Sequence, residues 1–424
     1  MPDDSIPALL APPLKRDNPF TRSVAGLVGM GFLALMLLVC VGTLPWTLGT
    51  PQGQVIPRYN EGSAVAGRLP PWWVRPNQAQ VLRFHGVVAA AEPAVVERIA
   101  AAHGIGADEV VVATEGPILA DMREHWPRYF LGTDVLGRSL LLRCLAGGGL
   151  SLGIGLAAAL LSVCIGTAYG AVAGYAGGRT DGVMMRVVDV LYGLPYVLLV
   201  VLLAVAGDAL VSEFVARNKE RAAWVRAEAR MVAAEQGLPG DNAWRDLLDE
   251  DAELRARLEE RAADALPARE MSKGTRSTLD VVTLLVAIGG LSWLTMSRVI
   301  RGQVLSLKNQ PFIEAARAVG VPLPRMFRRH LLPNLMGPII VYSTLTVPQA
   351  MLQESFLSFL GIGVKPPLPS WGNLAADGLE QLNPYDSNWW LLLFPCLLLG
   401  STLLALNFVG EGLREAMDPK RARR

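Results

Sequence analysis

The chain has 424 residues, of which 51% are apolar and only 18% are charged, and its net charge is +1 at pH 7. So many apolar residues argue against an ordinary soluble protein, and a net charge near zero argues against a nucleic-acid partner. The four cysteines (Cys40, Cys144, Cys164 and Cys396) are far apart. Their spacing predicts neither a metal site nor a redox pair.

Six segments are long and apolar enough to cross a bilayer as helices, which takes about 20 residues each. They cover residues 24–46, 148–175, 183–206, 279–299, 337–360 and 388–410. No clean cleavage site follows the first segment, so we interpret it as a retained anchor. The sequence therefore predicts an all-α integral membrane protein with six transmembrane helices, whose two termini lie on the same side.

Basic residues indicate which side this is. The segment between the fourth and fifth spans has one acid, Glu314, and seven basic residues: Arg298, Arg301, Lys308, Arg317, Arg325, Arg328 and Arg329. Cytoplasmic loops carry such an excess of lysine and arginine. We therefore predict that loop 301–335, the N-terminal tail 1–23 and the C-terminal tail 411–424 are cytoplasmic, in a multi-pass protein of the plasma (inner) membrane.

Two extracytoplasmic inserts follow from this orientation. In the first, 49–140, the pattern predicts a strand at Val81–Val88, a helix at Pro93–His103 and a strand at Val110–Thr114, which would make a small α/β unit.

The second insert, 208–277, separates the paired spans in 148–206 from those in 279–410 and is rich in Ala, Glu and Arg. Asp241 is a candidate helix N-cap, and Pro267 closes a run in which apolar residues recur at helical spacing. These are Leu247, Leu254, Leu258 and Ala262. The pattern predicts a helical hairpin, which is either a solvated spacer or a binding module.

The stretch from Glu314 to Asn334 predicts two short helices joined by a tight turn. Gly320 suits a left-handed C-cap, and Pro322 and Pro324 follow it in the turn. Pro333 is expected to end the second helix before the fifth span begins. Such a helix pair can transmit a rigid-body movement from a soluble partner into the membrane.

The spacing of these residues resembles the EAA loop of permease subunits of ATP-driven (ABC) importers, and histidine at position 330 resembles the dipeptide/oligopeptide/nickel subfamily. The resemblance implies the type I ABC importer permease fold, with this loop seated in a cleft of an ATPase subunit. The residues that would take this role are Glu314, Ala315, Ala316, Gly320, His330, Leu332 and Pro333. The alternative is an ordinary basic loop beside the membrane.

The resemblance extends over most of the membrane portion. It includes 131–138, where Ser139 replaces the family's following aspartate, and also 18–20, 173–178, 185–189, 194–195, 354–361, 366–367, 371–372 and 412–419. The two inserts are departures from the family pattern. The resemblance implies a second homologous permease subunit, two cytosolic ATPase subunits that bind the ATP, an extracytoplasmic solute-binding protein and no cofactor in this chain.

Some small, polar and charged residues within the spans are candidates for helix packing, ion pairing or contact with the substrate. Gly166, Gly170, Gly174 and Gly178 give one smooth helix face, either for static packing or for sliding against a partner permease. Arg186 and Asp189 are spaced to pair on one helix face. Gln353 and Glu354 could contact the substrate, line a hydrated gate or form hydrogen bonds between helices.

No phosphate-binding loop and no metal or hydrolase motif occurs in the sequence. A membrane-embedded enzyme with its site on the inserts would need clustered carboxylates or histidines there, whereas the charges are scattered. A passive channel would need no coupling loop. The transported solute stays open among dipeptides, oligopeptides, nickel chelates and peptide-like antibiotics.

Overall fold

The computed structural model describes residues 23–51, 56–238, 242–265, 273–383 and 387–417. Residues 1–22 and 418–424 of the predicted tails, and the predicted helix ends Asp241 and Pro267, lie outside these ranges. Throughout the described ranges the secondary structure is helical, apart from two isolated β-bridges, Thr133–Ser139 and Leu382–Ser387. The predicted all-α fold class is confirmed.

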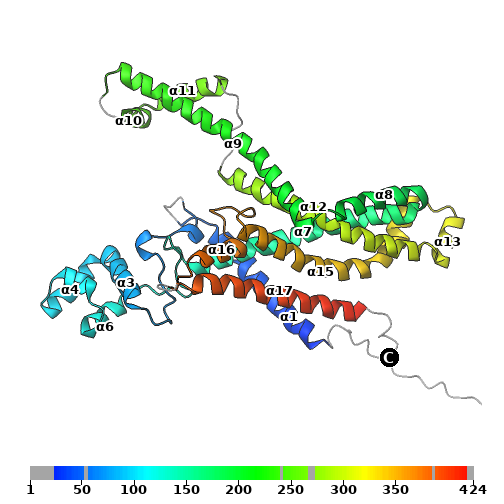
Figure 1. Cartoon of the computed structure of the whole chain (residues 1–424), viewed down its shortest axis with the longest axis horizontal. Helices are drawn as coiled ribbons and strands as arrows, with labels where there is room; N and C mark the ends of the chain where they lie inside the picture. Colours follow the sequence, from blue (N-terminus) through cyan, green and yellow to red (C-terminus); the bar gives the residue numbers. More distant parts are fainter. Residues whose placement is uncertain (1–22, 52–55, 239–241, 266–272, 384–386, 418–424) are drawn as a thin grey trace, which may run out of the picture.

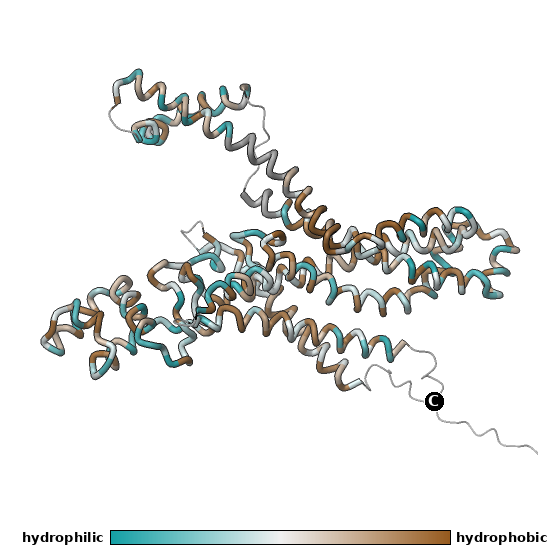
Figure 2. The backbone as a smooth tube through the Cα atoms, viewed as in Figure 1, coloured by the Kyte–Doolittle hydropathy of each residue, from teal (hydrophilic) through white to brown (hydrophobic). Residues whose placement is uncertain are grey.

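Five described helical segments are long and apolar enough to span a membrane, as the hydropathy in Figure 2 illustrates. The first comprises α1 (Val24–Met36), a π-helical turn (Leu37–Val41) and α2 (Leu44–Thr47). The others contain α7 (Leu140–Ala176), α12 (Lys273–Leu307), α15 (Leu332–Phe359) and α17 (Trp390–Met417). They correspond to the first, second, fourth, fifth and sixth predicted spans.

The third predicted span, 183–206, is not one continuous helix. It is divided between α8 (Gly178–Tyr192) and the start of α9 (Tyr196–Glu235), with a bend of 86° between them. Pro195 lacks a backbone N–H and disfavours helical geometry at the preceding Leu194, so the helix breaks here. When the bent pair counts as one span, the described chain has up to six spans.

The first insert is helical, and the predicted α/β unit is wrong. Residues 81–88 lie inside α3 (Gln78–Ala91), and 110–112 lie in α5 (Ala107–Val112). Asn77 and Gln80 form a reciprocal capping box that starts α3. The predicted helix at Pro93–His103 is confirmed as α4. With α6 (Gly116–Glu124), these helices bury a shared core that includes Val88, Val96, Val110 and Met122.

The second insert continues directly from the membrane portion because α9 extends to Glu235 without a break. α10 (Ala243–Glu250) and α11 (Ala252–Ala265) return along it, so the predicted hairpin is confirmed (Figure 1). The run that contains Leu247, Leu254, Leu258 and Ala262 is divided between these two helices. The carboxylate of Asp251 accepts hydrogen bonds from the backbone N–H groups of Glu253 and Leu254, which starts a new helix.

The predicted glycine face forms a close helix contact between α7 and α12. Gly166, Gly170 and Gly174 of α7 lie directly against α12, where any added Cβ atom would clash with α12 backbone or side-chain atoms. Gly178 does not belong to this face, because a Cβ there would meet nothing within 4 Å and its φ is +54°. The partner of this face is α12 of the same chain, which supports packing rather than sliding against another subunit.

Candidate coupling site

The segment after α12 forms a short helix, a turn and a second helix at one end of the bundle. α13 (Pro311–Ala318) is followed by α14 (Leu323–Met326) and a π-helical turn (Phe327–Leu331). In Figure 1, α13 lies at the opposite end of the molecule from α3, α4 and α6. The two inserts therefore lie away from the candidate coupling segment.

Gly320 ends α13 as predicted. Its φ is +75°, and its N–H donates to the carbonyl of Arg317 at 3.0 Å, while the N–H of Val321 donates to the carbonyl of Ala316 at 3.1 Å. This pair of bonds is a Schellman motif, which requires a left-handed residue after the C-cap. Glycine is the residue that adopts this conformation at least cost.

The prediction that Pro333 ends the second helix is wrong. α14 passes through the π-helical turn directly into α15, and Pro333 lies in the first turn of α15. A proline is accommodated there because the π-helical turn at Phe327–Leu331 directly precedes α15 and interrupts the regular i→i−4 hydrogen-bond pattern. The second coupling helix and the fifth span are consequently one continuous rod.

Three buried side chains fix the coupling segment to the bundle. Ile313 of α13, Met326 of α14 and Leu331 pack in one cluster with Ile300 of α12 and Leu335 of α15. All five are almost completely buried. Because close-packed side chains transmit displacement, a push on α13 reaches α12 and α15.

The opposite side of the segment is open. Glu314, Ala315 and Gly320 are exposed, and the side chain of Val319 is 84% exposed. Of the other predicted residues, Ala316, His330 and Leu332 are half-buried and Pro333 is exposed. The surface combines small and apolar residues with exposed arginines, namely Arg317, Arg325, Arg328 and Arg329. Such a face suits close docking of a protein partner that supplies acidic groups.

Polar contacts that sequence reasoning missed tie this end of the bundle together. Arg301 of α12 forms a bidentate ion pair with Asp181 of α8, and Lys308 donates a hydrogen bond to the carbonyl of Gly174 at 3.0 Å. Asp189 pairs with Arg298 of α12 at 2.9 Å, so the expected partner Arg186 is wrong. Charged residues near the end of an apolar helix were the only sequence feature that pointed to these pairs.

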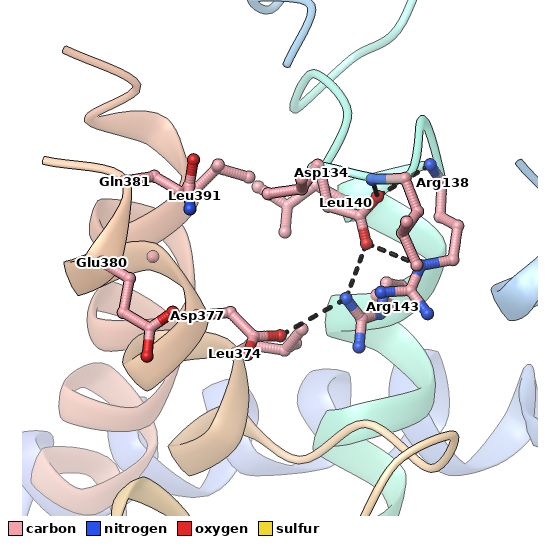
Figure 3. A pocket seen from close by; sticks show the side chains of 12 residues that line it. Asp134, Arg138, Leu140, Arg143, Leu374, Asp377, Glu380, Gln381 and Leu391 are labelled. Carbon is pink, nitrogen blue, oxygen red and sulfur yellow. Dashed lines mark hydrogen bonds and ion pairs between the residues drawn. The ribbon is translucent and has the colours of Figure 1, made fainter. Parts of the chain in front are cut away.

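The segment 131–138, one of those that resemble the permease family, forms a charge cluster with Arg143 at the other end of the bundle, in which Asp134 and Arg143 are buried (Figure 3). Asp134 accepts from the backbone N–H of Arg138 at 2.9 Å and from its Nε at 2.6 Å, and from Nη1 of Arg143 at 2.7 Å. Asp377 of α16 (Trp371–Glu380) approaches the same Arg143 nitrogen at 3.6 Å. The cluster joins the loop before α7 to α7 and α16. Arg143 was missed because no local pattern reveals its partners.

Glu354 is completely buried near the end of α15. Its carboxylate accepts hydrogen bonds from Ser358 Oγ at 2.7 Å and Ser355 Oγ at 3.2 Å, and Ser358 Oγ in turn accepts from the N–H of Val364 at 3.0 Å. Of the readings open at the sequence level, this geometry favours a hydrogen-bonding role that holds the loop after α15.

Residues 166–423 match the family described as "Binding-protein-dependent transport system inner membrane component". The oligopeptide transport system permease protein OppC of Haemophilus influenzae is 37% identical over 292 residues, which are 69% of this chain and 70% of the relative. The dipeptide transport system permease protein DppC of Bacillus subtilis is 37% identical over 297 residues, covering 70% of this chain and 69% of the relative. OppC of Escherichia coli is 37% identical over 292 residues, covering 69% and 72%. The chain therefore belongs to the family of binding-protein-dependent transport system inner membrane components, as a multi-pass ABC permease of the OppC/DppC type.

Proposed function

We propose that the chain forms half of the translocation pathway of an ATP-driven importer for peptides or peptide-like solutes. The observation that carries this proposal is the two-sided coupling segment, in which Ile313 is buried in the bundle while Glu314, Ala315 and Gly320 face outwards. The names of the similar proteins, which are oligopeptide and dipeptide permeases, support the peptide cargo.

A second homologous permease subunit would complete the pathway. Two cytosolic ATPase subunits would bind ATP and hold the coupling segments, and an extracytoplasmic solute-binding protein would deliver the cargo. In this assembly the chain itself binds no nucleotide. Its exposed surface around Val319 and Leu323 offers the apolar contact area that a protein partner requires.

The charge distribution supports a cytoplasmic position for α13 and for both termini. Four exposed arginines (Arg317, Arg325, Arg328 and Arg329) lie in or beside the coupling segment, and such an excess is typical of cytoplasmic loops. The helices α3 to α6, the later part of α9, and α10 and α11 extend away from the coupling end of the bundle (Figure 1). They would then lie outside, within reach of a solute-binding protein.

The packing suggests how the movement passes inwards. A displacement of α13 by the closing ATPases would act through Ile313 on Ile300 of α12, and through Met326 on the continuous rod of α14 and α15. α12 would carry α7 with it, because Gly170 lets the two backbones touch. The bundle would thus change as a few rigid units, which is the usual form of large conformational change.

The test is to replace Glu314 by Lys or Gly320 by Leu and to measure ATP-dependent peptide uptake and co-purification of the ATPase subunits. We expect both variants to remain in the membrane and to lose both ATP-dependent peptide uptake and co-purification of the ATPase subunits. The variant Glu235→Lys makes the same charge change at an exposed position of α9. Gly104→Leu is a matched backbone control, since Gly104 also ends a helix, at φ +66° in open space.

Both controls are expected to keep ATPase co-purification. Normal uptake by the two coupling variants would refute the proposed role of α13. Loss of co-purification in the controls as well would show that the effect is not specific to this segment.

A further inference from the structure

We infer that the segments joining the helices of the first insert to the spans lie at the membrane surface, where the exposed patch formed by Trp72, Trp73 and Phe130 is inserted into the lipid headgroup region. These three side chains are 53%, 49% and 57% exposed. Large aromatic residues gathered at a surface in this way mark an interaction site.

Two hydrogen bonds hold the patch together. The N–H of Trp72 donates to the carbonyl of Tyr129 at 3.0 Å, and Nε1 of Trp73 donates to the carbonyl of Phe130 at 2.9 Å. The segments around residues 72 and 130 therefore lie side by side, although 58 residues separate Trp72 from Phe130 along the chain. The patch is a built surface rather than two loose loops.

Contacts with the last span place the patch at the membrane boundary. The ring of Trp73 lies 6.5 Å from that of Trp389 and 6.3 Å from that of Phe394, both edge-on. Trp389 directly precedes α17, the last helix apolar enough to span the membrane. Trp73 therefore lies at the level where α17 enters the bilayer.

The first span ends in the same manner. Trp46 lies in α2 at the end of that span, is exposed, and has the guanidinium of Arg58 5.3 Å from its ring centre. Tryptophan is enriched at membrane–water interfaces, where its apolar ring and its polar N–H meet both phases. Trp46, Trp389 and the patch have the composition of such an aromatic belt.

The polar rim suits phospholipid. Arg75 and Arg128 are exposed and lie two residues from Trp73 and from Phe130, so their guanidinium groups can reach lipid phosphates. Burial raises the pKa of Tyr129, and the nearby charge of Glu61 raises it further. Because Glu61 is an acid close to this rim, insertion of the aromatic rings rather than net charge supplies most of the attachment.

The test uses the full chain, assembled with its partner subunits, in nanodiscs of phosphatidylethanolamine and phosphatidylglycerol. A nitroxide label is placed at Phe130→Cys after Cys164 and Cys396, the two exposed cysteines, are replaced by serine. Collision with oxygen and with a water-soluble nickel complex is then measured. The control label is Glu97→Cys on α4, an exposed position on a helix far from the spans in Figure 1.

We expect the label at position 130 to collide several-fold more with oxygen and several-fold less with nickel than the label at position 97. Adding Trp72→Ala should raise the nickel collision rate at position 130. Equal nickel access at the two positions would overturn the inference in favour of a water-exposed patch. Low access to both reagents would overturn it in favour of a protein partner.

Discussion

Asp181 and Arg301 form a bidentate ion pair between α8 and α12, with Nε 2.5 Å from Oδ1 and Nη2 2.6 Å from Oδ2. Only 8% of Asp181 is exposed. α12 ends at Leu307 and α13 begins at Pro311. The pair therefore connects the first half of the broken third span to the helix that carries the coupling segment.

Replacing Asp181 by Asn should lower the free energy of unfolding by about 2 kcal/mol, because a charge-assisted pair in a shielded place is lost. Thermal unfolding of the purified protein measures this. Asp189→Asn is the matched control, since its pair with Arg298 is largely exposed and should contribute less than about 1 kcal/mol. Equal losses in the two variants would show that the Asp181 pair has no special role.

The glycine face predicts a second pair of variants. Gly170→Ala should destabilise the protein by about 1–3 kcal/mol, because the new methyl group meets the backbone of Ser297 and forces α7 and α12 apart. Gly153→Ala in the same helix meets no atom within 4 Å. Its unfolding temperature should be unchanged or higher, and an unfolding temperature of Gly170→Ala equal to that of the wild type would disprove the close packing.

The buried serine network at the end of α15 gives a third prediction. Ser358→Ala removes one of the donors to Glu354 and the acceptor of the Val364 N–H, which should cost about 1–3 kcal/mol because the buried Val364 N–H loses its partner. Ser343→Ala is a suitable control, since Ser343 Oγ only donates to the carbonyl of Ile340 within its own helix. Similar unfolding temperatures for both variants would contradict the proposed network.

The helical domain of the first insert should respond to acid through His85. This side chain is completely buried, its Nδ1 lies 3.1 Å from the carbonyl of Val111, and burial lowers its pKa. The unfolded chain then binds more protons than the folded domain once the pH falls below about 6.5, the ordinary histidine value. The stability due to neutral His85 is therefore complete above that pH and is lost as the pH falls towards the lowered pKa.

Hydrogen exchange of α3 and α4, measured between pH 7 and pH 5 and corrected for the intrinsic pH dependence of exchange, would show the loss, at most about 1.4 kcal/mol per pH unit from one group. His85→Gln retains a hydrogen-bonding side chain that does not titrate. It should be less stable at pH 7 but show a smaller dependence on pH. An unchanged pH dependence in this variant would exclude His85 as the responsible group.

Local signals predicted the parts of the fold that local chemistry determines. The helix predicted at Pro93–His103 is α4, which begins with a proline and is followed by the left-handed Gly104. Gly320, also left-handed, ends α13. The strand predicted at 81–88 failed because valines in a short apolar run suit either a strand or a buried helix. The reciprocal bonds of Asn77 and Gln80 and the packing of Val88 selected the helix.

Contacts between distant segments could not be predicted in this way. Arg186 is the near neighbour of Asp189 in sequence, but α12 brings Arg298 to it from 109 residues away. Arg143 similarly meets Asp377 only because α16 folds back onto α7. The predicted coupling residues all lie in one segment. The buried side chains that anchor this segment, such as Ile313 and Met326, could be recognised only from their packing in the structure.

Cross-linking from Val319, which is 84% exposed in the turn after α13, tests most directly whether the coupling segment contacts an ATPase subunit on the cytoplasmic side. A Val319→Cys variant, assembled with its ATPase subunits, is treated with a membrane-impermeant cross-linker in inside-out vesicles and in intact spheroplasts. We predict an adduct with an ATPase subunit in the vesicles and no reaction in the spheroplasts. Reaction of Val319→Cys from outside the cell, with no ATPase adduct on either side, would contradict this prediction.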